Sequence, residues 1–223
     1  MKVVEYQDRD AAVTGVADVV KLALTEALAE FGTASLAVPG GTTPGPVFDR
    51  LSHAHLDWSR VTVMLTDERW VPDTHERSNA SLVRSRFLQN EAASASFLAF
   101  YRSGLSADHA AEGVSADVSK HLPLSVAVLG MGADMHTASL FPNSVGLKAA
   151  LRADAPAVCP IHTDSQPEPR ITLSAQVLNS AHQKHALIFG DEKRAALVAS
   201  EGMSPQEAPI RAVIDKGVVH WAP

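Results

Sequence analysis

The sequence predicts an open α/β sheet, mostly parallel, with helices on both faces. Short apolar runs alternate with helical patterns almost throughout the chain, which is the order expected of βαβ units. Runs such as Val61–Leu65 have no polar alternation, and strands of that kind lie inside a covered parallel sheet. With 223 residues, 46% of them hydrophobic, the chain can bury one substantial core. We therefore expect a single domain over residues 1–223.

The first predicted helix covers residues 10–31, where apolar residues recur every three or four positions and Gly32 follows the last of them. Further helices are predicted at 47–51, 79–88, 107–121, 173–178 and 192–199. Strands are predicted at 34–38, 61–65, 97–100, 124–129, 157–161, 185–189 and 218–221, the last of them as an edge strand. Segments 66–78 and 169–174 are interpreted as loops. No repeat or linker interrupts this alternation, so we expect one Rossmann-like sheet.

Composition excludes several classes of protein. A net charge of −6 without a basic run argues against nucleic acid and anionic membranes as partners. No apolar stretch approaches the roughly 20 residues of a membrane span, and the N-terminus turns charged where a signal peptide would be apolar, so a cytoplasmic protein is expected. Cys159, the only cysteine, lies in an apolar segment and is expected to be a buried structural thiol. No His or Cys spacing predicts a metal site.

Unusual residues gather in four segments, and three of these directly follow a predicted strand. In an open α/β sheet the loops at the carboxyl ends of the strands converge on one crevice. The first segment is Pro39-Gly-Gly-Thr-Thr-Pro44. Gly40 and Gly41 let the backbone approach a ligand closely, and Thr42 and Thr43 add hydroxyl donors before a helix whose N–H groups would suit a phosphate. The same residues would also make an ordinary strand-to-helix turn.

The second segment, Thr66-Asp-Glu-Arg-Trp-Val-Pro72, places charges directly behind a buried strand. Arg69 is a candidate bidentate clamp for phosphate or carboxylate. The alternative is a structural ion pair between Asp67 and Arg69. Ser78 or Asn79 is the expected N-cap of the next helix.

The third segment, Gly130-Met-Gly-Ala-Asp-Met-His-Thr-Ala-Ser-Leu-Phe-Pro142, follows the run 124–129. His136 is a candidate general base near neutral pH, and Asp134 is placed to fix its tautomer or orientation. The alternative is a polar loop in which His136 only caps the following turn.

The fourth segment is Pro169-Arg-Ile-Thr-Leu-Ser174, with Gly190-Asp-Glu-Lys193 further along the chain. Lys193 falls in the first turn of a predicted helix, where a cation opposes the helix dipole unless an anionic ligand is bound. Arg170 and Lys193 are therefore phosphate candidates, with ordinary surface charges as the alternative.

Taken in order, the four segments resemble those of the 6-phosphogluconolactonase family, within the wider group that includes glucosamine-6-phosphate deaminases. The resemblance covers nearly the whole chain. It implies hydrolysis of 6-phospho-D-glucono-1,5-lactone to 6-phospho-D-gluconate, a step of the pentose phosphate pathway, without a metal or organic cofactor. The expected partner is the phosphosugar lactone, and the expected state is a monomer or weak homodimer.

The resemblance also assigns roles to residues. It implies a catalytic set of His136, which polarises water, Asp134, which steadies the imidazolium, and Arg69. The residues expected to bind the substrate, including its phosphate, are Gly40, Gly41, Thr42, Asp67, Arg170 and Lys193, with Arg69 as a further phosphate clamp. Backbone N–H groups of the glycine loops are expected to face the oxyanion.

Two differences favour a lactonase over a deaminase. The deaminases carry an Asn-Glu-Pro stretch after their His loop, whereas this chain has Leu140-Phe-Pro-Asn143 there, with no acid. Arg69 also stands where the deaminases typically place an aromatic residue. A deaminase or isomerase stays open as the second hypothesis. The third is a non-catalytic sugar-phosphate sensor, although the chain lacks the length and the basic helix of such regulators.

One position departs from the family. The family usually has glycine between the Asp and the His, and this chain has Met135. If the position needs φ > 0, methionine costs about 1 kcal/mol there.

Overall fold

The computed structural model describes residues 1–223. In chain order its strands are β1 (Lys2–Glu5), β2 (Ala34–Val38), β3 (Val61–Leu65), β4 (Asp67–Arg69), β5 (Ser96–Leu98), β6 (Val126–Leu129), β7 (Val158–Ile161), β8 (Arg170–Leu173), β9 (Gln183–Phe189) and β10 (Val218–Ala222). Its helices are α1 (Arg9–Phe31), α2 (Gly45–Ser52), α3 (Asn79–Arg86), α4 (Ala107–Ser119), α5 (Leu147–Ala150), α6 (Ala175–Ser180) and α7 (Asp191–Ala199). Short 3-10 turns lie at Trp58–Arg60, Asn90–Ser94 and Pro209–Ala212.

Seven strands form one sheet in the order β1-β10-β9-β6-β2-β3-β5, and every neighbouring pair is parallel. The predicted α/β class is confirmed. From β2 the chain moves outward through β3 and β5, and later returns to β6 on the other side of β2. The direction of winding therefore reverses between β2 and β6, which is where open α/β sheets bind their ligands.

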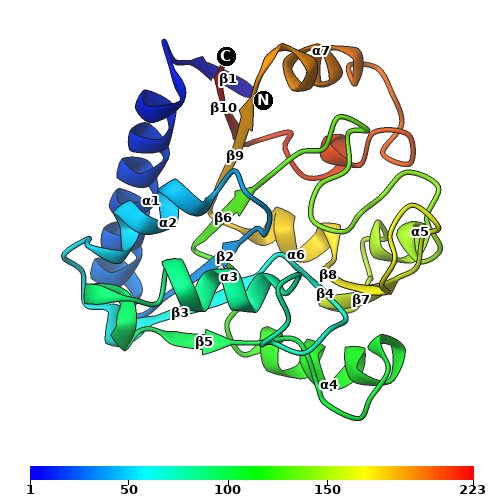
Figure 1. Cartoon of the computed structure of the whole chain (residues 1–223), viewed down its shortest axis with the longest axis horizontal. Helices are drawn as coiled ribbons and strands as arrows, with labels where there is room; N and C mark the ends of the chain where they lie inside the picture. The colour runs from blue at the N-terminus through cyan, green and yellow to red at the C-terminus, as the bar shows by residue number, and fades with distance from the viewer.

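Helices pack on both sides of this sheet. In Figure 1 α1 and α2 lie to the left of the sheet, and α5, α6 and the smaller strands lie to the right. Helix α1 contacts β2, β6, β9 and β10. It begins at the Asp8 N-cap, whose side chain accepts from the Ala11 N–H at 2.8 Å, and ends at Gly32, whose φ of 78° suits glycine.

The second and fourth polar segments, interpreted as loops, both contain strands, so those two predictions were wrong. Strand β4 (Asp67–Arg69) pairs antiparallel with β8 (Arg170–Leu173), and β8 pairs with β7 (Val158–Ile161) in a separate three-stranded sheet. Strand β7 was predicted correctly as a strand but does not belong to the parallel sheet. Strands β4 and β8 have three and four residues and bury charged side chains, so they show neither the alternation nor the apolar run on which a strand prediction depends.

The edge of the large sheet was also predicted wrongly. Strand β10 lies between β9 and β1, so β1 (Lys2–Glu5) is the edge strand. Most of its residues are exposed, and it carries a charge at each end, as edge strands often do.

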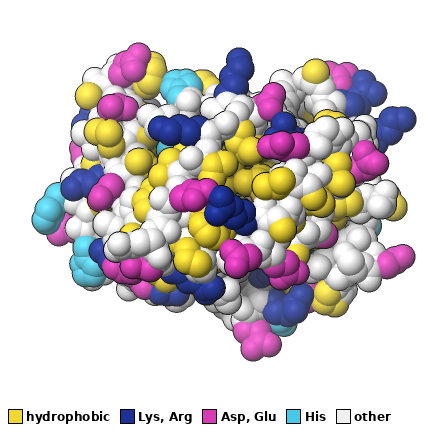
Figure 2. All heavy atoms as spheres, turned by 90° about the horizontal axis from the view of Figure 1, so that it is seen from above, with side chains coloured by type: hydrophobic (Ala, Val, Ile, Leu, Met, Phe, Trp, Pro, Cys, Tyr) yellow, Lys and Arg dark blue, Asp and Glu magenta, His cyan; other side chains and the backbone are white.

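Figure 2 shows the face that carries α7 and the chain ends. Hydrophobic side chains gather in its central part, and Lys and Arg side chains are interspersed with Asp and Glu around them. No helix is both long enough and apolar enough to span a membrane.

Two buried histidines, His185 of β9 and His220 of β10, lie side by side in the large sheet. The Tyr6 hydroxyl is 2.8 Å from His220 Nδ1, and His220 Nε2 is 3.1 Å from His185 Nδ1. Burial, with smaller effects from His185 and Lys2, lowers the pKa of His220 from 6.5 to about 4. Burial also lowers the pKa of His185. Both rings are therefore neutral in the folded protein at neutral pH.

The free energy of unfolding should fall as the pH drops from about 6.5 towards 4. In this pH range His220 and His185 bind protons in the unfolded chain but stay neutral in the folded chain, so acid favours unfolding. For His220 alone the loss should reach about 3 kcal/mol and level off below its folded pKa. Denaturant titrations between pH 4 and 8 measure it, with His220→Gln as the matched variant. A variant whose stability falls with pH as steeply as that of the wild type would contradict the assignment.

Candidate active site

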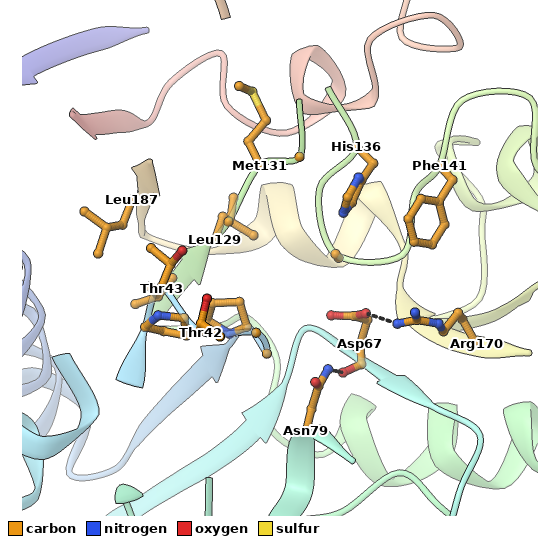
Figure 3. Close-up of a pocket in the computed structure, with 18 of the residues that line it drawn as sticks. Thr42, Thr43, Asp67, Asn79, Leu129, Met131, His136, Phe141, Arg170 and Leu187 are labelled. Carbon is orange, nitrogen blue, oxygen red and sulfur yellow. Dashed lines mark hydrogen bonds and ion pairs between the residues drawn. The ribbon is translucent and has the colours of Figure 1, made fainter. Parts of the chain in front are cut away.

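A cavity of about 340 Å³ lies at the carboxyl ends of β2 and β6. The loops after these two strands form two of its walls. The start of α3, the loop between β7 and β8, and the elements β4, β8, β9 and α7 supply the rest. Eight of the nine residues singled out in the sequence line it: Gly40, Gly41, Thr42, Asp67, Arg69, His136, Arg170 and Lys193. In Figure 3 His136 and Phe141 face Asp67 and Arg170, with Thr42 and Thr43 on the other side of the cavity.

The ninth residue, Asp134, lies directly behind His136. Its Oδ1 is 2.5 Å from His136 Nδ1 and also accepts the His136 backbone N–H at 3.3 Å. Burial raises the pKa of Asp134, but the hydrogen bonds and charge of His136 outweigh it, and the pKa lies below its usual value. A carboxylate on Nδ1 holds the proton there, which leaves Nε2 as the basic nitrogen towards the cavity. Phe141 supports the ring, with the two ring centroids 4.5 Å apart.

Gly132 makes room for the Asp134–His136 pair. A Cβ at Gly132 would lie 2.3 Å from His136 Cε1 and Nδ1 and 2.4 Å from Asp134 Oδ1. Its backbone N–H donates to the His136 carbonyl at 3.0 Å, which closes the loop on itself. The loop is therefore built around a position that only glycine fills without a clash.

The same loop holds three non-glycine residues with positive φ: Met135 at 66°, Ala138 at 49° and Asn143 at 59°. The strain expected at Met135 is therefore present. Backbone strain of this kind persists where the surrounding structure enforces it. The carbonyl of Met135 accepts from the Ile210 N–H at 3.1 Å, which ties the loop to the 3-10 turn at Pro209–Ala212.

At position 135, glycine should be more stabilising than alanine by about 1 kcal/mol. Met135→Gly and Met135→Ala lose the same side-chain contacts, so the comparison isolates the cost of a Cβ at positive φ. Denaturant unfolding of both variants measures the difference. At exposed Lys21 in α1 the same pair of substitutions should show the usual order, with alanine better by about 1 kcal/mol. The usual order at position 135 as well would contradict the backbone argument.

Asp67 connects three walls of the cavity. Its Oδ2 accepts from the Ser139 hydroxyl at 2.5 Å and lies 3.9 Å from Arg170 Nη1, and its Oδ1 accepts from the Thr66 hydroxyl at 3.1 Å. The alternative Asp67–Arg69 ion pair does not form. Ser139 and His136 belong to the same loop, residues 130–146 between β6 and α5, which we call the His loop. Asp67 therefore links the His loop to β8.

Arg69 and Arg170 are directly opposite each other on the paired strands β4 and β8. Like charges in that position repel, and the Nε atom of each is buried without a hydrogen-bond partner. Arg69 Nη1 donates to the Arg77 carbonyl at 2.7 Å, and Arg170 Nη2 donates to Gln166 Oε1. Asp67, 3.9 Å from Arg170 Nη1, is the only carboxylate in ion-pair range of the two guanidiniums. Glu168 also acts on Arg170, but it is hydrogen-bonded to Arg77 at 2.9 Å, so the site favours an added anion.

Lys193 lies in the first turn of α7, as predicted, and no carboxylate pairs with it within 4.0 Å. Burial lowers the pKa of its ammonium, and nearby Glu192 raises it to a smaller extent.

Helix α2 begins at Gly45 with Pro44 as its N-cap. Thr42 lies in the loop before this helix and lines the cavity.

Three further residues near the cavity were not predicted as site residues. Glu68 is buried and accepts from the Asn79 and Ala80 N–H groups at 2.7 and 2.8 Å, which fixes the start of α3. Burial raises the pKa of Glu68, and these donors counter it. Asn79 lines the cavity and donates to the Asp67 carbonyl at 2.8 Å (Figure 3). Gln166 reaches the cavity from the loop between β7 and β8.

Other expectations concern local structure. Ser78 is the N-cap of α3, and its side chain accepts from the Ser81 N–H. Cys159 is buried, and burial raises its pKa to about 11, as expected of a structural thiol. No group of three or more His, Cys, Asp and Glu side chains is arranged to hold a metal ion.

Fold and cavity together define a class of protein. It consists of α/β enzymes that have a cationic pocket and an oriented histidine where the direction of winding of a parallel sheet reverses. The family of glucosamine-6-phosphate isomerases and 6-phosphogluconolactonases matches residues 7–221 of this chain. A 6-phosphogluconolactonase of Pseudomonas aeruginosa is 45% identical over 90% of this chain and 86% of its own length. One of Rhizobium meliloti is 40% identical over 98% and 97%.

Solved structures agree with these sequence comparisons. A 6-phosphogluconolactonase from Shewanella baltica OS155 superposes with a TM-score of 0.96, at 34% identity, over 100% of this chain and 98% of that one. The chain belongs to the glucosamine-6-phosphate isomerase/6-phosphogluconolactonase family.

Proposed function

We propose that this protein is a 6-phosphogluconolactonase, which hydrolyses 6-phospho-D-glucono-1,5-lactone to 6-phospho-D-gluconate by a metal-independent reaction. The proposal depends mainly on His136. Asp134 holds its Nδ1, its Nε2 makes no hydrogen bond within the protein, and it lines the same cavity as Arg69, Arg170 and Lys193. The names of the relatives support the same activity.

In the proposed reaction His136 Nε2 takes a proton from a water molecule as the water oxygen attacks the lactone carbonyl. A lactone is an activated ester, so no covalent nucleophile is needed. The tetrahedral oxyanion then collapses, the bond between the carbonyl carbon and the ring oxygen breaks, and the imidazolium returns its proton to that oxygen. Asp134 stabilises the imidazolium between these two transfers. Donors from Arg69 or the glycine loops would face the oxyanion.

The charges of the cavity suit a phosphate. Arg69, Arg170 and Lys193 bring three positive charges against the one carboxylate of Asp67 that lines the cavity. A phosphate monoester carries nearly two negative charges at neutral pH, so it would relieve the repulsion between the two opposed guanidiniums. Binding the phosphate orients the ring towards His136, and such positioning lowers the barrier of the reaction.

Phe141 favours the lactonase over the deaminase. It lies in the same loop as His136, at the position where the deaminases carry their acid, and it packs against the His136 ring and lines the cavity. An apolar ring there supplies no carboxylate for ring opening or proton transfer. Parallel assays of lactone opening and of ammonia release from glucosamine 6-phosphate separate the two functions. Ammonia release without faster lactone hydrolysis would establish the deaminase instead.

Arg69→Ala should mainly raise the apparent KM for the phosphorylated lactone, by roughly 10- to 100-fold, because charge-assisted bonds to the phosphate are lost. Initial rates across substrate concentrations measure it. Arg84→Ala, which removes an exposed arginine 3.6 Å from Asp73, is the control and should leave both constants unchanged. A fall in kcat at constant KM would instead assign Arg69 to the oxyanion.

Two further predictions from the sequence stay with this proposal. A cytoplasmic location fits an enzyme that acts on a phosphorylated sugar lactone. A monomer or weak homodimer is expected, and light scattering across a concentration series measures the mass.

A further inference from the structure

Gln166 is the one residue of the loop between β7 and β8 that lines the candidate active site. Its side chain also lines a neighbouring cavity of about 400 Å³, whose wall is formed mainly by residues 162–169 of the same loop. Gln166 therefore lies between the two cavities. The proposed lactonase reaction, as described so far, gives it no role.

The backbone that carries Gln166 is held on both sides of this residue. The Gln166 N–H donates to the Thr163 carbonyl at 3.3 Å, which closes a turn in the first half of the loop. Two residues further on, Glu168 forms a two-point ion pair with Arg77. Its Oε1 lies 2.7 Å from Arg77 Nε, and its Oε2 accepts from Nη2 at 2.9 Å. The side chain of Gln166 thus reaches the cavity from a fixed position.

The orientation of the Gln166 amide follows from its partner. Arg170 Nη2 donates to Gln166 Oε1, and because a guanidinium has no acceptor, the oxygen end of the amide faces it. Arg170 is only 4% exposed, so it cannot swing away. It lines the candidate active site and not the neighbouring cavity. The Nε2 end of the amide makes no hydrogen bond within the protein, so it presents two N–H donors at the wall of the candidate active site.

Asp67 lies at the other Nη group of the same guanidinium, with Oδ2 3.9 Å from Arg170 Nη1. Its two oxygens accept one hydroxyl each, from Ser139 and Thr66. A carboxylate has about four acceptor positions, so it can accept more. An acceptor and an amide donor therefore flank one buried cation. Figure 3 shows His136 facing Asp67 and Arg170, which places this donor and acceptor on the side of the cavity that carries the candidate base.

We propose that Gln166 is a specificity-determining residue, whose Nε2 donates to a hydroxyl oxygen of the sugar lactone while Asp67 accepts from a neighbouring hydroxyl. The inference rests on the proposed lactonase function. A sugar hydroxyl both donates and accepts, so adjacent hydroxyls match a donor and an acceptor side by side, whereas the oxygens of a phosphate dianion only accept. In this arrangement the cations bind the phosphate, and Gln166 selects a hydroxylated ring.

Calorimetric titration tests this with two ligands, 6-phosphogluconate and 6-phosphooxyhexanoate, which has the same chain length, phosphate and carboxylate but no hydroxyl groups. Gln166→Leu should raise the ratio of the first dissociation constant to the second by about tenfold, because only 6-phosphogluconate loses a hydrogen bond. Gln166→Glu keeps an acceptor for Arg170 but loses both donors. Its added charge weakens both ligands alike, so the ratio should rise by the same factor. A ratio that stays at the wild-type value in either variant would overturn the proposal.

Kinetics give a second readout. Gln166→Leu should raise KM for the phosphorylated lactone about tenfold with little change in kcat, because the contact is made in the ground state and the transition state alike. Gln89→Leu is the control: Gln89 is exposed outside the cavity, donates from Nε2 to the Arg84 carbonyl at 2.7 Å, and should behave as the wild type. A wild type that neither hydrolyses the lactone nor binds 6-phosphogluconate would refute the proposed function itself. An active wild type matched by Gln166→Leu in KM and in the ratio would refute the role of Gln166 alone.

Discussion

His136→Ala should lower kcat for lactone hydrolysis by roughly 10²- to 10⁴-fold, the range expected when a positioned general base is removed. The reason is geometric: Asp134 engages Nδ1 at 2.5 Å and leaves Nε2 as the basic atom towards the cavity. The KM should change little, because the cationic groups expected to bind the phosphate stay in place. Initial rates corrected for spontaneous hydrolysis measure both constants.

The chain offers a matched control for this substitution. His162 also pairs with an aspartate, its Nε2 lying 3.1 Å from Asp108 Oδ2, but it does not line the candidate active site. His162→Ala should hydrolyse the lactone at the wild-type rate. Equal losses in the two variants would mean that general damage to the fold, and not a missing base, explains the effect.

Gly132→Ala should reduce kcat by about 100-fold, which is the cost of displacing a catalytic group by about 1 Å. The added Cβ would lie 2.3 Å from His136 Cε1 and Nδ1, so the imidazole and the Asp134 carboxylate cannot both keep their positions. The stability should fall much less than the activity, because the His136 side chain is 31% exposed and can swing aside.

Gly113→Ala in α4 is the control for the Gly132 substitution. A Cβ there meets nothing within 4 Å, so activity should be unchanged and stability should rise by about 0.5–1 kcal/mol. Enzyme assays and denaturant unfolding of both variants give the comparison. Full activity in Gly132→Ala would contradict the packing described for the His loop.

The parallel sheet and the position of the candidate site could be predicted from the sequence. Apolar runs predicted β2, β3, β6 and β9 to within a residue or two, and the polar segments after β2 and β6 converge on one cavity as open sheets require. The positive φ at Met135 could also be anticipated, because glycine is usual at that position in the family.

Strands β4 and β8 of the small antiparallel sheet could not be predicted, because they are short and bury charges. The pairing of Arg69 with Arg170 joins residues about a hundred positions apart, and no local pattern reports such a contact. For the same reason the sequence did not show that Asp67 faces Ser139 and Arg170 instead of Arg69.

Chemical rescue tests the central claim most directly, that an imidazole base at position 136 activates water against a phosphosugar lactone. Hydrolysis of 6-phosphogluconolactone is followed with the wild type and with His136→Ala, with and without added imidazole, after subtracting the rate in imidazole buffer alone. We expect the wild type to accelerate hydrolysis, the variant to lose nearly all of it, and imidazole to restore part of it in a saturable way. A variant that matches the wild-type rate without imidazole would contradict the account.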